Sequence, residues 1–586
     1  MKTTKNIARL AVTAGLTAVL SFGGVMAPVS MAFAAGTPVA TTSGNVTIKD
    51  DDYAGTTFKG IKIFSATVTQ NQTSADVWDS TGEKTLSDIT WASDDVKTAV
   101  MGVFDGDANK PENDDAQAWA EFIKEQAGSD NVGEGVKVNA DNELNVIAAK
   151  LVSTERLVWT DLANSETKNL DAGYWLFVTK QPGSTKETNP TNGNVDAYTS
   201  PIFVTVGGED INVVPKKDVP NVTKAVKDDK DDKWLTDDSQ NVFTAANKAA
   251  DSASDQPVEY QLAGTVAGNI NTYTKYSYAF TDELPATMVP KLQDGKPVVE
   301  VKIGDSVVKS DCYSATYTPG ESSNTLTVSF ENLKEAKDVE GNTISVDGNS
   351  KVYVNYTAKL DSSKVTADML GKAQANNVKL TYSNNPHTNG TGTTVDHPAY
   401  DYTYGIDVTK VGSDNASKGL ENVEFTLQEV VDGSAQTQYI DAQGVKHNDV
   451  KDAALKTDNN GKINVVGLDE GTYILKEVTP APGYNNSASK GVTFTIARGT
   501  LKQDGSEVIP DKDLAKITAD KDVVKADSAA VSTGKLSFTI VDKKGSNLPL
   551  TGLNGVTFTW IAGGAVLCIG VAHLIRSRRR DEDSEE

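Results

Sequence analysis

The sequence is poor in cysteine, with only Cys312 and Cys568 among its 586 residues. Cys568 lies in an apolar run near the C-terminus, so the part of the chain before this run cannot form an intrachain disulfide. If such a chain is secreted and carries load, it must be stabilised in another way. Other covalent cross-links therefore have to be considered.

Histidine is equally scarce. The four histidines are His387, His397, His447 and His573. None has a Ser/His/Asp, Cys/His or zinc-ligand spacing. The run Asp105-x-Asp107-x-Asn109 begins like a calcium loop but lacks the glycine and the terminal glutamate of that pattern, so a solvated turn is expected. We therefore expect no metal, no cofactor and no classical enzyme.

Positive charge is in deficit as well. Lysine and arginine number 56 against 80 aspartate and glutamate residues, which gives a formal net charge of −24. So acidic a surface repels nucleic acid and favours a soluble extracellular protein.

The N-terminal segment has the order of parts of a secretory signal peptide. Basic residues come first, residues 10–25 are apolar and small, and Ala32-Phe33-Ala34 provides the small-x-small pattern that signal peptidase reads. We expect cleavage after Ala34, so that residues 1–34 are removed. The alternative, an N-terminal membrane helix, is disfavoured because Gly23, Gly24 and Pro28 interrupt the run.

The C-terminal segment predicts a single membrane span. Residues 555–575 include no Asp, Glu, Lys or Arg, and as a helix they would reach roughly 30 Å, about one hydrocarbon core. A basic tail follows, with Arg576, Arg578, Arg579 and Arg580. These arginines would hold the short C-terminus on the cytoplasmic side and leave the rest of the chain outside.

Between these two ends the chain is predicted to be all-β. Segments rich in Val, Thr, Tyr and Phe, such as residues 352–356, alternate with Gly, Asn and Asp turns, such as residues 458–461. This pattern favours tandem immunoglobulin-like β-sandwiches. We place the domains at residues 35–215, 216–398 and 399–547, with boundaries at proline-containing linkers.

One helix is predicted within the first domain. Its apolar face would comprise Ala116, Trp119, Ala120, Phe122 and Ile123. Asp114 or Asp115 can cap its start and Gly128 can end it. We interpret this helix as an insertion into a β-domain.

The C-terminal run begins with Leu548, Pro549, Leu550, Thr551 and Gly552. Motif, apolar span and basic tail together resemble the cell-wall sorting signal of Gram-positive surface proteins. The resemblance implies that a sortase cuts between Thr551 and Gly552 and that residues 548–586 form the signal. The alternative is a plain membrane anchor in which the motif arises by chance.

A second motif surrounds Lys216. The segment Ile211-Asn212-Val213-Val214-Pro215-Lys216-Lys217 resembles the pilin motif of sortase-assembled backbone pilins, although three positions depart from it. In that family a class C sortase joins the motif lysine of one subunit to the threonine of the next. Strand alternation favours Lys216 over Lys217 as the exposed acceptor amine. The alternative is that both are solvated linker lysines.

The third domain contains Tyr473-Ile474-Leu475-Lys476-Glu477, followed by Gly483-Tyr484. This segment resembles the E-box of Cna B-type domains, in which a first-strand lysine condenses with a last-strand Asn or Asp, assisted by the E-box glutamate. Strand alternation places Lys410, Glu477 and Asp542 on core-facing positions. The resemblance implies a Lys410–Asp542 isopeptide bond with Glu477 as the proton carrier. The alternative is a buried ionic cluster without a bond.

The second domain repeats this arrangement. Residues 280–285 and 380–386 resemble pieces of the fimbrial isopeptide-forming D2 domain. The resemblance and strand alternation together predict a bond between Lys224 and Asn384, with Asp282 as the proton carrier and Asn384 preferred over Asn385. We predict no cross-link in the first domain.

These resemblances imply the backbone subunit of a covalently assembled surface pilus, secreted and anchored to the cell wall. The implied partners are class C and housekeeping sortases, further copies of the chain, peptidoglycan, and tip and base pilins. The competing hypothesis is a monomeric wall-anchored adhesin, since such proteins share the sorting signal and the cross-linked domains.

Overall fold

The structure is a computed structural model. It describes residues 21–22, 36–51, 53–80, 83–127, 140, 142–185, 198–215, 219–227, 249–497, 500–501, 508–509, 515–518, 523–525, 530–532 and 534–545. Lys216, the LPLTG motif, the predicted span and most of the predicted signal peptide lie outside these residues. Among the described residues, no helix is long and apolar enough to cross a membrane.

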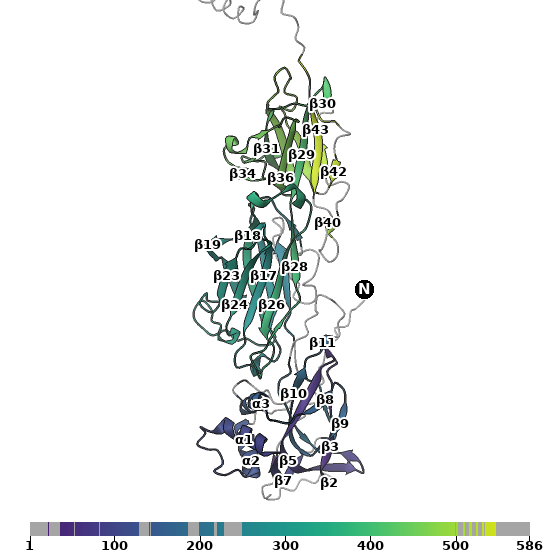
Figure 1. The fold of residues 1–586 in the computed structure, drawn as a ribbon, viewed down its shortest axis with the longest axis vertical. Coiled ribbons are helices and arrows are strands. Elements are labelled where there is room, and N and C mark those ends of the chain that lie inside the picture. The colour runs from purple at the N-terminus through teal and green to yellow at the C-terminus, as the bar shows by residue number, and fades with distance from the viewer. Residues whose placement is uncertain are drawn as a thin grey trace, which may run out of the picture.

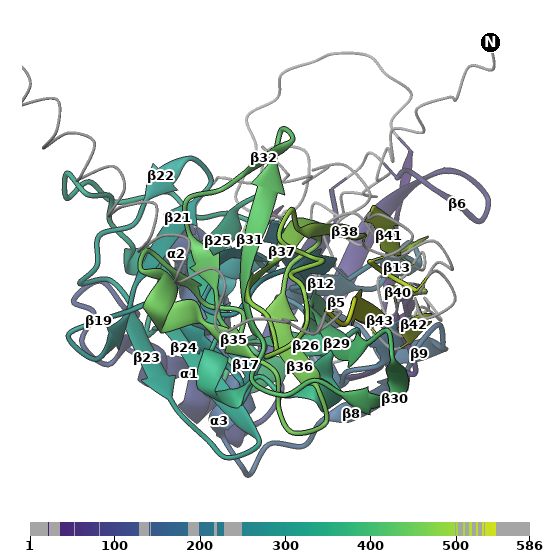
Figure 2. The same ribbon diagram turned by 90° about the horizontal axis from the view of Figure 1, so that it is seen from above.

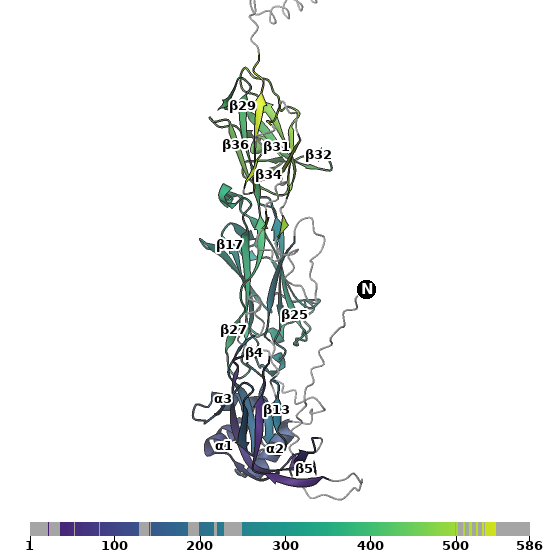
Figure 3. The same cartoon turned by 90° about the vertical axis from the view of Figure 1, so that its right-hand side faces the viewer.

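Three β-domains are stacked end to end, so the molecule is a rod (Figures 1 and 3). Seen from above, the domains lie over one another (Figure 2). The predicted class, tandem β-sandwiches with a helical insertion in the first domain, is confirmed.

The first domain is built on an eight-stranded sheet with the order β1-β7-β5-β10-β12, and β2, β6 and β8 also pair with β5. Its strands are β1 (Ser21–Phe22), β2 (Thr37–Thr41), β5 (Thr57–Ser74), β6 (Val77–Trp78), β7 (Thr85–Trp91), β8 (Thr160–Ala163), β10 (Gly173–Gln181) and β12 (Ile202–Val206). Two smaller sheets comprise β3 (Ser43–Ile48), β9 (Thr167–Asp171) and β13 (Ile211–Val213), and β4 (Tyr53–Ala54) with β11 (Ser184–Thr185).

The helical insertion is larger than the sequence indicates. The predicted helix is α2 (Ala116–Ala127), and Asp115 caps it by accepting a hydrogen bond from the Ala118 amide at 2.8 Å. Two further helices, α1 (Asp94–Met101) and α3 (Glu143–Ser153), were not predicted. All three contribute to one core with strands β5, β7 and β10. A separate core lies between the large sheet and the β3-containing sheet.

The second domain is a sandwich of a six-stranded and a seven-stranded sheet around one core. The six-stranded sheet comprises β14 (Val222–Lys227), β16 (Val258–Thr265), β18 (Met288–Pro290), β21 (Val299–Ile303), β22 (Ser306–Val307) and β25 (Lys351–Leu360). The seven-stranded sheet comprises β15 (Ala249–Asp251), β17 (Tyr278–Pro285), β23 (Ser314–Thr318), β24 (Ser323–Phe330), β26 (Gln374–Ser383), β27 (Thr391–Thr393) and β28 (His397–Tyr402). A hairpin of β19 (Leu292–Gln293) and β20 (Lys296–Pro297) stands apart.

The third domain packs a five-stranded sheet against an eight-stranded one. The five strands are β29 (Tyr404–Gly412), β30 (Asn415–Gly419), β36 (Lys462–Leu468), β42 (Ala530–Ser532) and β43 (Lys535–Asp542). The eight are β31 (Glu424–Val431), β32 (Ser434–Ala435), β33 (Tyr439–Ile440), β34 (Lys446–His447), β35 (Leu455–Lys456), β37 (Gly471–Thr479), β38 (Val492–Ile496) and β41 (Ala515–Thr518). The pair β39 (Thr500–Leu501) and β40 (Val508–Ile509) completes it.

The domains meet through short, hydrogen-bonded joints. Thr403 alone separates β28 of the second domain from β29 of the third, a few residues beyond the boundary predicted after residue 398. The Ser254 amide donates to the Gly467 carbonyl at 2.9 Å across this joint. Between the first two domains, Asn145 Nδ2 donates to the Thr272 carbonyl at 2.8 Å. These contacts hold the three sandwiches in line.

Candidate functional site

In the third domain, the first and last long strands lie side by side. β29 and β43 run parallel, with Lys410 opposite Ile540 and Gly412 opposite Asp542. Because side chains alternate along a strand, Lys410 and Asp542 are directed to the same face, two places apart. Ile406, Val408, Phe538 and Ile540 on that face are all buried. The apolar alternation of both strands therefore carries a lysine and a carboxylate into the core.

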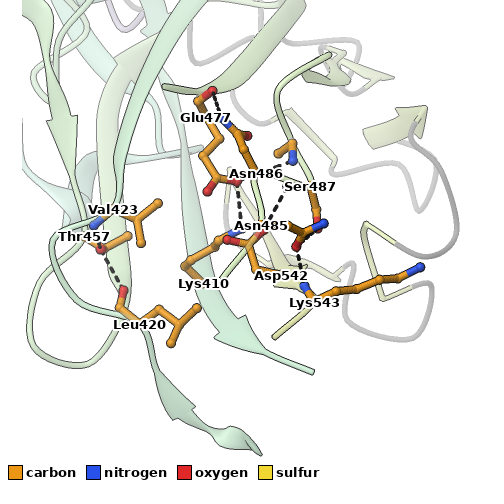
Figure 4. Close-up of polar contacts among 11 residues, drawn as sticks. Lys410, Leu420, Val423, Thr457, Glu477, Asn485, Asn486, Ser487, Asp542 and Lys543 are labelled. Carbon is orange, nitrogen blue, oxygen red and sulfur yellow. Dashed lines mark hydrogen bonds and ion pairs between the residues drawn. The ribbon is translucent and has the colours of Figure 1, made fainter. Parts of the chain in front are cut away.

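The two side chains meet there, and Glu477 joins them from the facing sheet (Figure 4). Lys410 Nζ lies 2.5 Å from Asp542 Oδ1 and 2.9 Å from Glu477 Oε2. All three side chains are 0% exposed. The Phe425 ring covers the ammonium group, with its centroid 5.7 Å from Nζ. The structure thus brings together the three residues that the sequence singled out in this domain.

Burial sets the protonation of this cluster. It raises the pKa of Glu477 to about 7, against the opposing pull of Lys410. A carboxyl group with that pKa can take up and release a proton near neutral pH. The Ser487 amide donates to Asp542 Oδ1 at 3.1 Å, which fixes the orientation of the carboxylate. An amine, a carboxyl carbon and a proton carrier are therefore in contact in a dry site.

The second domain holds another buried lysine, on a different arrangement of strands. Lys224 lies on β14, at the edge of the six-stranded sheet, and faces the seven-stranded sheet. Its Nζ donates a short hydrogen bond to Asp282 Oδ1 on β17 and lies 3.1 Å from the Tyr356 hydroxyl. The Lys224 and Asp282 side chains are both 0% exposed.

Burial also controls protonation in this second cluster. It lowers the pKa of Lys224 to about 8, although Asp282 acts in the opposite direction. It raises the pKa of Asp282 above its ordinary value, against the effect of Lys224. The first shift favours an amine that can act as a nucleophile, and the second makes the Asp282 carboxylate a better acceptor of a proton that it can then pass on.

Asn384 does not join this cluster. β17 pairs with β26 so that Asp282 lies opposite Val378, which leaves Asn384 six positions further on, about 20 Å along the strand. Its backbone carbonyl instead accepts a hydrogen bond from the Tyr198 amide of the first domain, at 2.9 Å. The predicted pairing of Asn384 with Lys224 therefore does not agree with the observed register.

A different asparagine of the same strand takes this place. Asn376 is 0% exposed, and its Nδ2 donates to the Tyr356 hydroxyl at 2.8 Å. That hydroxyl also contacts Lys224 and Asp282. Among the described residues, Asn376 Oδ1 has no hydrogen-bond partner. Asn376 is thus the amide that the structure brings to Lys224.

Sequence reasoning could have considered this residue. Asn376 has the same parity as Val378, Leu380 and Asn384, so strand alternation favours both asparagines equally. Only the register of β26 against β17 distinguishes the two asparagines. Hydrophobic alternation tells which face of the sheet a residue lies on, but not which residue of the neighbouring strand it lies opposite. Tyr356 was missed as well, because a buried tyrosine in a Val/Tyr strand is first interpreted as core.

The remaining predicted residues cannot be placed in the fold. Lys216 and residues 548–552 are outside the described residues. Val214, two residues before Lys216, is 71% exposed. In the third domain the described chain stops at Gly545, three residues before Leu548. The Gly545 amide still donates to the Gly483 carbonyl at 2.9 Å, so the fold is ordered almost to the LPLTG motif.

Comparison with known proteins agrees with this description of the third domain. Residues 405–508, which lie in the third domain, match the family model described as "SpaA: Prealbumin-like fold domain". No curated protein sequence matches the chain.

Solved structures with a similar fold include three backbone or major pilins. The T6 backbone pilin of serotype M6 Streptococcus pyogenes is 13% identical over 86% of this chain and 99% of that one, with a TM-score of 0.48. The major pilin SpaD of Corynebacterium diphtheriae is 16% identical over 86% and 97%, with a TM-score of 0.41. The pilus backbone RrgB of Streptococcus pneumoniae is 13% identical over 56% and 100%, with a TM-score of 0.35.

Proposed function

We propose that this chain is the structural backbone subunit of a covalently polymerised cell-surface pilus. Thr551 of one subunit is joined by a class C sortase to Lys216 of the next, and a housekeeping sortase attaches the finished polymer to peptidoglycan. The chain is secreted, spans the membrane transiently before sorting, and can be joined to tip and base pilins.

One observation carries the proposal. In the part of the chain that the structure describes, the second sandwich of the rod buries a lysine against one carboxyl group and the third buries a lysine against two. Removing a lone charge from water costs several kcal/mol, so such clusters are poor devices for ordinary stability. As precursors of covalent bonds, these clusters can cross-link the domains in place of disulfides. A polymer under tension requires cross-links of this kind.

In the third domain the proposed bond joins Lys410 to Asp542. The unprotonated Nζ attacks the Asp542 carboxyl carbon, Glu477 donates its proton to the departing oxygen and takes up the proton that the nitrogen releases, and one water leaves. The contact of 2.5 Å between Nζ and Oδ1 supports this step. The close approach provides the orientation that accelerates intramolecular reactions.

In the second domain the proposed bond joins Lys224 to Asn376 rather than to Asn384. Nζ attacks the Asn376 amide carbon, the C–N bond to Nδ2 breaks, and one ammonia leaves. Asp282, in contact with Nζ, accepts the proton that the attacking nitrogen releases. The shared contact of Lys224 and Asn376 with the Tyr356 hydroxyl supports this pairing.

Polymerisation is tested with two adjacent lysine variants. In cells that carry the matching sortase, Lys216→Ala is expected to abolish the SDS-resistant ladder of high-mass species, whereas Lys217→Ala keeps it. Peptide mass spectrometry of the wild-type ladder should find Thr551 linked to Lys216. A ladder that survives in Lys216→Ala overturns the acceptor assignment. A wild-type chain that is anchored to the wall but forms no ladder supports the monomeric adhesin instead.

A further inference from the structure

The Tyr356 hydroxyl is the centre of the polar cluster in the second domain. It lies 3.1 Å from Lys224 Nζ, 2.5 Å from Asp282 Oδ2 and 2.8 Å from Asn376 Nδ2. It therefore contacts the attacking amine, the proton carrier and the leaving nitrogen at once. Tyr356 comes from β25, in the same sheet as Lys224, while Asp282 and Asn376 come from the facing sheet.

The position of the hydroxyl bears on how ammonia leaves. Among the described residues, Asn376 Nδ2 donates to the Tyr356 hydroxyl and the Asn376 side chain also interacts with Tyr260, but no hydrogen bond joins Asn376 to Asp282. Asp282 Oδ1 contacts Lys224, and its other oxygen contacts Tyr356. A proton taken from the lysine by Asp282 therefore reaches the leaving nitrogen through the tyrosine hydroxyl.

We propose that Tyr356 is a catalytic residue of bond formation in the second domain, and that its hydroxyl passes a proton from Asp282 to the departing amide nitrogen of Asn376. This inference rests on the proposed Lys224–Asn376 bond and adds a step to it. The role of the Tyr356 hydroxyl does not follow from the sequence motifs, nor from the pairing of Lys224 with Asn376.

The step balances in atoms and protons. Lys224 Nζ forms a bond to Asn376 Cγ, and the nitrogen releases one proton to Asp282. In the tetrahedral intermediate Nδ2 is no longer a planar amide nitrogen, so its lone pair becomes basic. Tyr356 donates its proton to Nδ2 and is reprotonated by Asp282. The Cγ–Nδ2 bond breaks, ammonia leaves, and Asp282 and Tyr356 return to their starting forms.

The surroundings suit a hydroxyl that donates. Burial, with a further contribution from Asp282, raises the pKa of Tyr356 well above its ordinary value, so the hydroxyl keeps its proton until a base forms beside it. The stacked Tyr260 ring, with its centroid 5.3 Å away, fixes the plane of the Tyr356 ring. Positioned proton transfer of this kind typically contributes roughly 100-fold or more to a rate.

The test follows bond formation in the full chain. Protein recovered unfolded from inclusion bodies is diluted into buffer, quenched with acid at intervals and digested, and the linked Lys224–Asn376 peptide is quantified by mass spectrometry. Tyr356→Phe is expected to slow its appearance by roughly 100-fold. Tyr278→Phe is the matched control, because Tyr278 is a buried tyrosine of the same domain whose hydroxyl donates to the Thr265 carbonyl at 2.8 Å.

The outcomes separate the inference from the bond on which it rests. A wild-type chain that never loses ammonia overturns the Lys224–Asn376 bond itself. A wild type that links and a Tyr356→Phe chain that links at the same rate leave the bond in place and overturn the role of Tyr356. Formation of the Lys410–Asp542 peptide in the same samples shows that the third domain has folded.

A folding defect is handled by a second pair of variants. The chain with Lys224→Met and Tyr356→Phe cannot form the bond, so its resistance to trypsin reports whether phenylalanine is tolerated at this position. If it is not, 3,5-difluorotyrosine at position 356 keeps the ring and the hydroxyl but ionises more easily. The rate of linkage is then expected to fall at a lower pH in the modified chain than in the unmodified chain. If the two chains have the same pH profile, the inference is overturned.

Discussion

The second and third domains both bury a lysine beside a carboxyl group, but they distribute the residues around the lysine differently over the two sheets of the sandwich. In the third domain, Lys410 and Asp542 lie on neighbouring strands of one sheet, and Glu477 reaches them from the facing sheet. In the second, Lys224 lies on one sheet, while Asp282 and Asn376 lie on the other. The proposed bond partner therefore changes sheets relative to the lysine, whereas the proton carrier lies on the facing sheet in both domains.

This difference determines what each bond would hold together. A Lys410–Asp542 bond would join the first and last strands of one sheet, strands that are already hydrogen-bonded along their length. A Lys224–Asn376 bond would join the two facing sheets of the sandwich. In the third domain Lys410 and Asp542 are in contact, and Glu477 is the one proton carrier of the proposed reaction. In the second domain Asn376 is not in contact with Asp282, and the proton is proposed to reach it through Tyr356.

The largest effect is expected from removing Lys410. Lys410→Ala leaves Glu477 and Asp542 buried without a cation and opens a loop of roughly 130 residues, so the free energy of unfolding should fall by roughly 5 kcal/mol or more. Lys224→Ala should cost less, because Asp282 keeps the hydrogen bond from Tyr356. Denaturant unfolding followed domain by domain with limited proteolysis measures both.

The control for this comparison is a lysine of the same strand pair. Lys535 forms an ion pair with Asp407 at 2.6 Å, with side chains 31% and 29% exposed, and such pairs contribute about 1 kcal/mol or less. Lys535→Ala should therefore change the unfolding free energy little. An equal loss for Lys410→Ala and Lys535→Ala would contradict a covalent role for Lys410.

The next effect separates two asparagines of one strand. Asn376→Ala should prevent the loss of ammonia from the intact mass and lower the unfolding free energy of the second domain by roughly 5 kcal/mol, because the closed loop of roughly 150 residues is released. Asn384→Ala should keep the mass deficit. Intact mass spectrometry of the full chain decides, and a deficit that disappears only in Asn384→Ala would restore the pairing predicted from sequence.

The sequence predicts the fold class because strand alternation is a local property. The buried sides of the strands around Lys224, Asp282, Lys410, Glu477 and Asp542 follow directly from apolar residues two places away. The tandem β-architecture follows from the same alternation and from turn residues. These features need no knowledge of which strands pair.

The sequence does not predict what depends on register and on long-range packing. Asn376 and Asn384 are equivalent by alternation, and only the pairing of β17 with β26 places one of them at Lys224. Tyr356 joins the cluster from β25, and the position of that strand depends on its pairing within the six-stranded sheet. Helices α1 and α3 do not depend on register and could have been predicted, because their buried apolar residues follow helical spacing, as Leu144, Ile147, Ala148 and Leu151 of α3 do.

The smallest predicted effect concerns pH and contrasts the two domains in one sample. Lys224 must lose its proton to attack, and its pKa is about 8, so linkage in the second domain should speed up as pH rises through that value. Glu477 must hold a proton to assist departure of water, and its pKa is about 7, so this assistance to linkage in the third domain should be lost as pH rises through that value. Each rate should change by up to about tenfold per pH unit.

The measurement refolds the unfolded full chain at a series of pH values and quantifies both linked peptides after a fixed time. Their ratio cancels the yield of refolding, and the share of the Lys224–Asn376 peptide should rise from acid to alkaline pH. Glu477→Gln cannot exchange a proton, so any residual linkage in its third domain should lose this pH dependence. If the ratio of the two peptides instead stays constant with pH, the two reactions share one pH dependence, and the different placement of Asp542 and Asn376 has no consequence for the chemistry.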